Sequence, residues 1–182
     1  MRFGSAIRAL RKFATWLTRP DVGGDVVCNA HLIRLATLAD APDIAAMARD
    51  YIERGLPWRW DYWRVAKAIK RVDVNVAVVG GPGAVIGFGV MSYGDDVAHL
   101  QLLAVRTARQ RQGVARAIVG WLEAVARTAG ARRIHVEARL ENVAARSLYN
   151  ELGYHEQAIE RLMYHGVVDG VRLEKWLVPA VD

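Results

Sequence analysis

Cysteine, proline and long apolar runs are all scarce in this chain of 182 residues. Cys28 is the only cysteine, which excludes a disulfide within the chain and indicates a reducing compartment. No apolar run approaches the roughly 18 residues that cross a bilayer, so we expect no membrane span. These features favour a cytoplasmic protein, and the length favours one main domain with a well-buried core.

Acidic residues are absent from the beginning of the chain. Residues 1–19 carry five basic side chains and no acidic one, and they account for five of the six units of net positive charge. The other 163 residues hold 20 basic and 19 acidic side chains. The high isoelectric point therefore belongs to the N-terminal segment, and we expect no nucleic-acid partner.

The same segment has the pattern of an amphipathic helix. Its apolar residues recur every three or four positions, at Phe3, Ile7, Leu10, Ala14 and Leu17. We therefore expect residues 1–28 to form a basic amphipathic helix and a linker, followed by the main domain over residues 29–182. Several roles stay open for this helix: packing on the domain or on a second subunit of a homodimer, weak contact with a membrane surface, or a disordered tail.

The rest of the chain alternates between strand and helix patterns. Periodicity predicts strands over residues 31–37, 72–79, 85–93, 97–105, 133–138, 156–164 and 171–178. It predicts helices over residues 41–54, 61–71, 113–129 and 142–152, with Asp40 as N-cap of the first. The order β-α-α-β-β-β-α-β-α-β-β predicts an α/β fold, a mixed α+β sheet with helices on both faces.

A short polar loop between the strand ending at Val105 and the helix opened by Gly113 is the clearest motif. It fits the pattern (Gln/Arg)-x-x-Gly-x-(Gly/Ala), formed by Gln110, Arg111, Gln112, Gly113, Val114 and Ala115. Backbone N–H groups at a helix start have no intrahelical partner and bind anions readily. The spacing matches neither the P-loop nor the dinucleotide fingerprint, so a different diphosphate ligand is indicated.

A second motif follows this loop in the sequence. Its pattern is Asn, a helix of small residues, then Leu-Tyr-x-x-Leu-Gly-Tyr, formed by Asn142, Leu148, Tyr149, Leu152, Gly153 and Tyr154. The two motifs resemble motifs A and B of the GNAT superfamily of acetyl-coenzyme A-dependent N-acetyltransferases. The resemblance runs from about Leu32 to Leu177. The chain departs from the family at Thr107, where proline is usual, and at Ala115, where glycine is commoner.

The resemblance implies the GNAT acyl-CoA N-acyltransferase fold and acetyl-CoA as cosubstrate. In that fold, strands equivalent to 97–105 and 133–138 splay apart, and the pantetheine arm lies between them. The loop amides would hold the diphosphate. The residues expected to bind the coenzyme are Leu103, Ala104, Val105, Gln110, Arg111, Gln112, Gly113, Val114, Ala115, Arg116, Asn142 and Arg146.

The family chemistry is direct attack of a neutral amine on the thioester, and the resemblance makes Tyr149 the acid for the departing thiolate. Strict alternation along residues 97–105 would put His99, Gln101 and Leu103 on one face. Because GNAT enzymes often carry a histidine or glutamate on this strand, His99 is the first candidate base. Glu137 and a water held by Gln101 stay open. No His/Cys cluster has zinc-ligand spacing, so we expect no metal.

The acceptor is the least constrained part of the prediction. A tryptophan-rich segment suggests that Trp58 and Trp60 line the acceptor pocket with Tyr164, although these tryptophans would equally serve as packing anchors. A small amine or amino-acid-like metabolite is the first choice. A protein N-terminus is the alternative, because Arg161, Tyr164 and Asp169 resemble part of the ribosomal-protein N-terminal acetyltransferases. A non-catalytic acyl-CoA-binding regulator is a further alternative.

Overall fold

The computed structural model describes residues 32–177. The predicted N-terminal helix, the linker with Cys28 and the last residues of the chain lie outside this range. A seven-stranded sheet with the order β1-β2-β3-β4-β5-β7-β6 forms the centre of the fold. Its strands are β1 (Ile33–Leu35), β2 (Val74–Gly81), β3 (Ala84–Tyr93), β4 (Val97–Val105), β5 (Arg133–Arg139), β6 (His155–Tyr164) and β7 (Val168–Trp176).

The helices follow the predicted order, with small differences at their ends. They are α2 (Ala41–Met47), α3 (Tyr62–Lys70), α4 (Val114–Thr128) and α5 (Val143–Glu151). The predicted helix over residues 41–54 is α2 continued by a π-helical turn, η2 (Ala48–Ile52). Short 3-10 turns, η1 (Leu38–Asp40) and η3 (Thr107–Arg109), complete the set. The predicted mixed sheet with helices on both faces is therefore confirmed.

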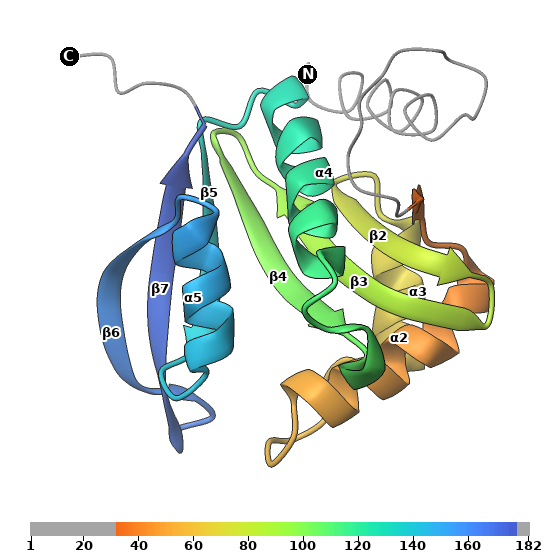
Figure 1. Ribbon diagram of the computed structural model, residues 1–182, viewed down its shortest axis with the longest axis horizontal. Coiled ribbons are helices and arrows are strands. Elements are labelled where there is room, and N and C mark those ends of the chain that lie inside the picture. The colour runs from red at the N-terminus through yellow and green to blue at the C-terminus, as the bar shows by residue number, and fades with distance from the viewer. Residues whose placement is uncertain (1–31, 178–182) are drawn as a thin grey trace.

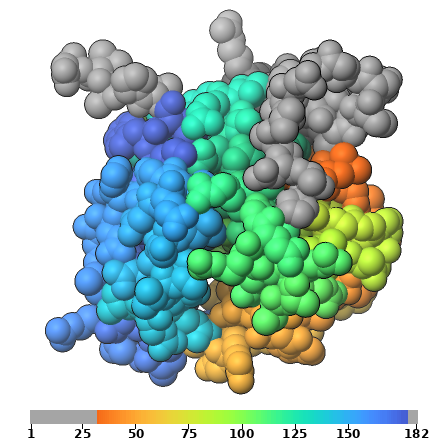
Figure 2. All heavy atoms as spheres, in the orientation of Figure 1, coloured from red at the N-terminus to blue at the C-terminus, as the bar shows by residue number. Residues whose placement is uncertain are grey.

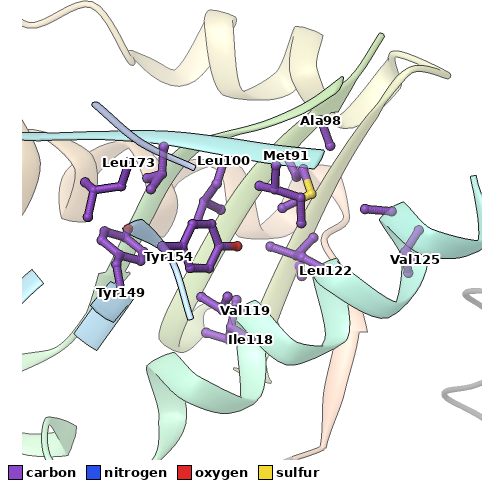
Figure 3. Close-up of a cluster of buried hydrophobic side chains, with 14 of the residues drawn as sticks. Met91, Ala98, Leu100, Ile118, Val119, Leu122, Val125, Tyr149, Tyr154 and Leu173 are labelled. Atoms are coloured by element: carbon purple, nitrogen blue, oxygen red, sulfur yellow. The ribbon is translucent and has the colours of Figure 1, made fainter. Parts of the chain in front are cut away.

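Two hydrophobic clusters lie on opposite faces of the sheet (Figure 1). One joins α4 and α5 to the strands, and Figure 3 shows Tyr149 and Tyr154 within it beside Leu100 and Leu173. The other joins α2 and α3 to β2, β3 and β4. Gly89 lets α4 approach β3 closely, because a Cβ atom there would lie 2.8 Å from a methyl group of Ile118.

Asp40 precedes α2 as predicted, but its side chain has another role. Its fully buried carboxylate accepts two hydrogen bonds from the guanidinium of Arg34, at 2.7 and 2.8 Å, and two more from Thr37. No side-chain cap bond to α2 forms. Burial alone would raise the pKa of Asp40, but the bonds from Arg34 and Thr37 outweigh it and hold the pKa below its ordinary value. The carboxylate thus ties β1 to the start of the helix.

A bulge at Gln101 changes which side chains of β4 share a face. Val90 pairs with Leu102, whereas Met91 pairs with Leu100, so Gln101 is the extra residue. Leu100 packs on the α4 side, and Leu103 packs there too. His99 alternates with Leu100 and therefore lies on the opposite face from Leu103. The predicted common face for His99, Gln101 and Leu103 is wrong, because strict alternation does not survive a bulge.

Strands β4 and β5 are joined only along part of their length. Their parallel pairing runs from Val97–Arg133 to Leu100–Val136. Beyond Leu100 the two strands diverge, and Figure 1 shows the widening gap between them. The splayed pair expected from the family resemblance is therefore present.

Candidate active site

A cavity of about 500 Å³ lies where β4 and β5 diverge. Figure 2 shows a crevice here, between the cyan and blue atoms of α5 and the green atoms that follow β4. The cavity is lined by Tyr51, Ile52, Arg54, Leu100, Gln101, Leu102, Leu103, Val136, Glu137, Ala138, Arg139, Glu141, Asn142, Ala145, Tyr149 and Tyr164. Residues of α5 line it on one face of the sheet and residues of η2 on the other. It therefore passes through the gap in the sheet, so two substrates can approach from opposite faces.

Tyr149 reaches this cavity from the last part of α5. Its side chain is only 5% exposed, and its ring lies 5.5 Å from that of Tyr154. Burial, with a smaller effect of nearby Tyr164, raises the pKa of Tyr149 above its ordinary value. The phenol therefore keeps its proton at neutral pH and can donate it to a developing anion.

Glu137 reaches the cavity from β5. Its carboxylate lies 3.5 Å from the guanidinium of Arg172, which also binds Glu160 at 2.8 Å. Tyr164 and Gln101 line the same space, and Gln101 donates a hydrogen bond to Ser92 (3.1 Å). The structure therefore brings a carboxylate and a protonated phenol together, which are the two kinds of group that an acyl transfer to an amine requires.

His99 does not line this cavity. Its ring stacks on that of His135, with centroids 4.0 Å apart, where β4 and β5 are still paired. Burial, followed by the charges of His135 and Arg172, lowers the pKa of His99 from 6.5 to about 4. The His99 ring therefore lies away from the residues that line the cavity, and this position favours Glu137 over His99 as the base.

The loop before α4, which the sequence predicts to bind phosphate, has the expected form. Gly113 is the N-cap of α4 with a φ of 81°, a left-handed conformation that favours glycine. The amide of Ala117 donates to the carbonyl of Gly113 at 2.9 Å. The amides of residues 113–116 therefore lie in the first turn, ahead of the intrahelical bonds, where an anion can bind them. These features fit the diphosphate of acetyl-CoA.

Replacing Gly113 with valine should weaken acetyl-CoA binding strongly. A β-branched residue is strained at this φ, by roughly 1–3 kcal/mol, and its side chain would stand beside the amides that bind the phosphates. Isothermal titration with acetyl-CoA measures the loss. Gly120→Val is the matched control, because Gly120 lies exposed on the same helix with no atom near its Cβ position. Equal affinity of Gly113→Val and the wild type would refute the assignment of this loop.

The other residues predicted to bind the coenzyme fall into three groups. Leu103 and Asn142 line the cavity, and the Asn142 side chain also caps α5 by accepting a hydrogen bond from the amide of Ala145 (3.1 Å). Arg116 and Arg146 instead make ion pairs, with Glu151 at 2.6 Å and Glu156 at 2.7 Å. The remaining predicted residues do not line the cavity. Ala104 and Val105 are buried at the end of β4, Gln110, Arg111 and Gln112 belong to the loop, and Val114 and Ala115 belong to the first turn of α4.

The acceptor residues predicted from the sequence are only partly brought together. Tyr164 lines the cavity, whereas Trp58 and Trp60 do not. The indole of Trp58 donates to the carbonyl of Trp60 (3.1 Å), and Trp60 packs against the cluster around α2 and α3. The packing interpretation therefore describes Trp60, whereas Trp58 is 48% exposed. Among the cavity residues that the sequence did not reveal are Tyr51, Ile52, Arg54, Arg139 and Glu141.

Two other sequence-based expectations concern metals and membranes. Within residues 32–177, no group of three or more His, Cys, Asp or Glu side chains is placed to hold a metal ion. No helix in the same part of the chain is both long enough and apolar enough to span a bilayer.

A split mixed sheet, a helix start that can bind phosphate and a cavity between the diverging strands are the features expected of an acyl-CoA-dependent transferase. The family model of the acetyltransferase (GNAT) family matches residues 45–154, and the chain belongs to this family. This is the family that the two sequence motifs predicted.

Known proteins with similar sequences and structures agree with this assignment. The chain is 34% identical over 88 residues to the [ribosomal protein bS18]-alanine N-acetyltransferase of Escherichia coli strain K12. This match covers 48% of the chain and 59% of the relative, so it spans little more than half of that protein.

Solved structures cover more of the chain. The ribosomal-protein-S18-alanine N-acetyltransferase of Escherichia coli has a TM-score of 0.68 at 25% identity, covering 84% of this chain and 97% of that one. Ard1 from Thermoplasma volcanium has a TM-score of 0.71 at 20% identity, over 82% and 99%. An acetyltransferase of Salmonella typhimurium, solved with acetyl-CoA as its cofactor, has a TM-score of 0.69 at 21% identity, over 85% and 98%.

Proposed function

We propose that this enzyme acetylates the α-amine of a protein N-terminus, with Glu137 as proton acceptor and Tyr149 as proton donor. The observation that carries the proposal is the cavity through the split sheet, which both side chains line. Tyr149 belongs to the α5 side, next to the gap in which pantetheine would lie. Glu137 belongs to the strand edge that faces the acceptor side.

Each of these residues has a defined task. Acetyl-CoA supplies the acetyl thioester. The amides at the start of α4 bind its diphosphate. Beyond Leu100, the edge of β4 that no longer pairs with β5 is available to pair with the pantetheine arm. Glu137 accepts the proton that the attacking nitrogen loses, directly or through a water. Tyr149 gives its proton to the sulfur as the carbon–sulfur bond breaks, and the buried hydroxyl is protonated for this step.

The chemistry of the base favours an α-amine over a lysine side chain. A free α-amine with a pKa near 7.8 is roughly one-seventh neutral at pH 7, whereas a lysine near 10.4 is about 3.5 kcal/mol less ready to react. Two carboxylates, Glu137 and Glu141, line the cavity. A carboxylate is a far weaker base than a lysine amine, so the site gives little help in deprotonating a lysine. An acceptor with a low amine pKa suits it better.

The residues that line the cavity and the relatives support a polypeptide acceptor. Tyr51 of η2, Arg54 just after η2 and Tyr164 at the end of β6 all line the cavity, and these large side chains offer contacts for the residues of a peptide. The curated relatives act on the alanine of a ribosomal protein, as their names state. The small-amine acceptor that the sequence favoured first stays as the competing possibility.

A comparison of acceptors tests the proposal. Short peptides with a free N-terminal alanine, serine or methionine are compared with spermidine, lysine and glutamate by the release of free thiol from acetyl-CoA. Mass spectrometry places the acetyl group, and the same peptides with a blocked N-terminus serve as controls. We expect the free peptides to give the highest kcat/KM and the blocked ones to give none. A higher kcat/KM for a small amine would overturn the polypeptide acceptor.

A further inference from the structure

Arg139 joins two segments of the chain that are far apart in sequence. It ends β5, and its side chain is only 20% exposed. One guanidinium nitrogen donates hydrogen bonds to the carbonyl of Ile52 (2.9 Å) and to the carbonyl of Arg54 (2.7 Å). The other terminal nitrogen lies 3.7 Å from Glu141. The charged side chain of Arg139, which lines the cavity, thus donates hydrogen bonds to backbone carbonyls on the opposite wall.

These carbonyls lie at the C-terminal end of a helix. Ile52 is the last residue of η2, which continues α2. Carbonyls at a helix end have no intrahelical partner and carry partial negative charge, so a cation close to them is favourable. A π-helical turn is also a strained ending that often occurs at functional sites. Arg139 supplies, from another strand, the cap that this helix end lacks.

A second contact fixes the other side of the same turn. Glu53 is 9% exposed, and its carboxylate accepts hydrogen bonds from the amides of Arg59 (3.1 Å) and Trp60 (3.0 Å). The hydrogen bonds of Arg139 therefore fix the beginning of the segment 52–60, and those of the Glu53 carboxylate fix its end. The hydrogen bonds of Arg139 join this segment to β5, so the distance of the segment from that strand depends in part on Arg139.

That segment forms one wall of the acceptor side of the cavity. Tyr51, Ile52 and Arg54 line it, facing Glu137 and Tyr164 across the opening. We propose that Arg139 is a positioning residue that sets the width of the acceptor entrance by fixing residues 51–54. The inference rests on the function proposed above, and it assigns Arg139 to acceptor binding rather than to coenzyme binding or proton transfer.

Three variants test this role. Arg139→Gln removes the charge and weakens the hydrogen bonding to the two carbonyls, whereas Arg139→Lys keeps the charge with a less suitable geometry. Arg133→Gln is the control, because Arg133 lies at the other end of β5, where it pairs with Glu174 (3.1 Å). For Arg139→Gln we expect the acceptor KM to rise roughly 10- to 100-fold, because charged hydrogen bonds of this kind contribute about that much. The Kd for acetyl-CoA should not change. Arg139→Lys should recover part of the loss, and Arg133→Gln should match the wild type.

Limited trypsin digestion gives a readout that needs no acceptor. Arg54 and Arg59 are exposed cleavage sites within the held segment, and both should be cut faster in Arg139→Gln than in the wild type or in Arg133→Gln. The inference is overturned if cleavage of Arg139→Gln is unchanged, or if its acetyl-CoA Kd rises as much as its acceptor KM. If no peptide is a substrate of the wild type, the proposed acceptor fails, while faster cleavage would still show that Arg139 holds the wall.

Discussion

Replacing Tyr149 with phenylalanine should lower kcat by roughly 10²- to 10⁴-fold, the range expected when a positioned proton donor is lost. The coenzyme should bind almost as before, since we expect its diphosphate to contact the start of α4, on another helix. The ring of Tyr149 packs in the core, and a phenylalanine ring would fill the same space. The change therefore removes little besides the hydroxyl. Stopped-flow measurement of thiol release, with isothermal titration of acetyl-CoA, separates the two quantities.

The neighbouring ring of Tyr154 provides the matched control. It is fully buried in the same cluster but does not line the cavity (Figure 3). Tyr154→Phe should therefore keep kcat near the wild-type value. If Tyr149→Phe is as active as Tyr154→Phe, Tyr149 is a packing residue and another group, such as a water, protonates the sulfur.

Replacing Glu137 with glutamine should produce the second large loss, again roughly 10²- to 10⁴-fold in kcat/KM at neutral pH. The amide cannot accept the proton of the attacking amine. Activity that remains should rise with pH, because more of the acceptor then loses its proton to solvent before it attacks. Glu160→Gln is the control, since Glu160 binds the same Arg172 without lining the cavity. Equal losses in the two variants would mean that Arg172, and not the carboxylate of Glu137, is what matters.

The same pH profiles decide between Glu137 and His99. The pKa of His99 is lowered to about 4, so His99 stays uncharged between pH 5 and 8 and should add no limb near pH 6.5. His99→Gln should therefore keep the shape of the wild-type profile over that range. A limb near pH 6.5 in the wild type that disappears in His99→Gln would restore His99 as the base.

Local patterns predicted most of the fold. Helix and strand periodicity, the glycine before α4 and the asparagine before α5 are signals carried by neighbouring residues, and the predicted order of elements is the observed one. The bulge at Gln101 was not predictable, because it depends on how β3 pairs with β4. It moves His99 away from the face expected from alternation, and with it the first candidate base.

The site was predictable where a motif carried it. Tyr149 and the loop before α4 belong to local patterns with a fixed spacing. The acceptor side is built differently, because Arg139 contacts residues more than 80 positions earlier. No pattern of residue spacing in the sequence predicts such a long-range contact. The tryptophans were conspicuous in composition, but Trp60 packs against the cluster around α2 and α3, and neither Trp58 nor Trp60 lines the cavity.

The stacked histidines have a consequence for folding as well as for catalysis. His99 and His135 face each other within the short paired stretch that joins β4 to β5, and burial lowers the pKa of both. A histidine whose pKa is lower in the folded state takes up protons more readily when the chain is unfolded. The free energy of unfolding therefore keeps its full value above pH 6.5 and decreases as the pH falls toward 4. The junction between the two halves of the sheet should thus be acid-sensitive, and urea denaturation of His99→Gln should depend less on pH across this range than that of the wild type.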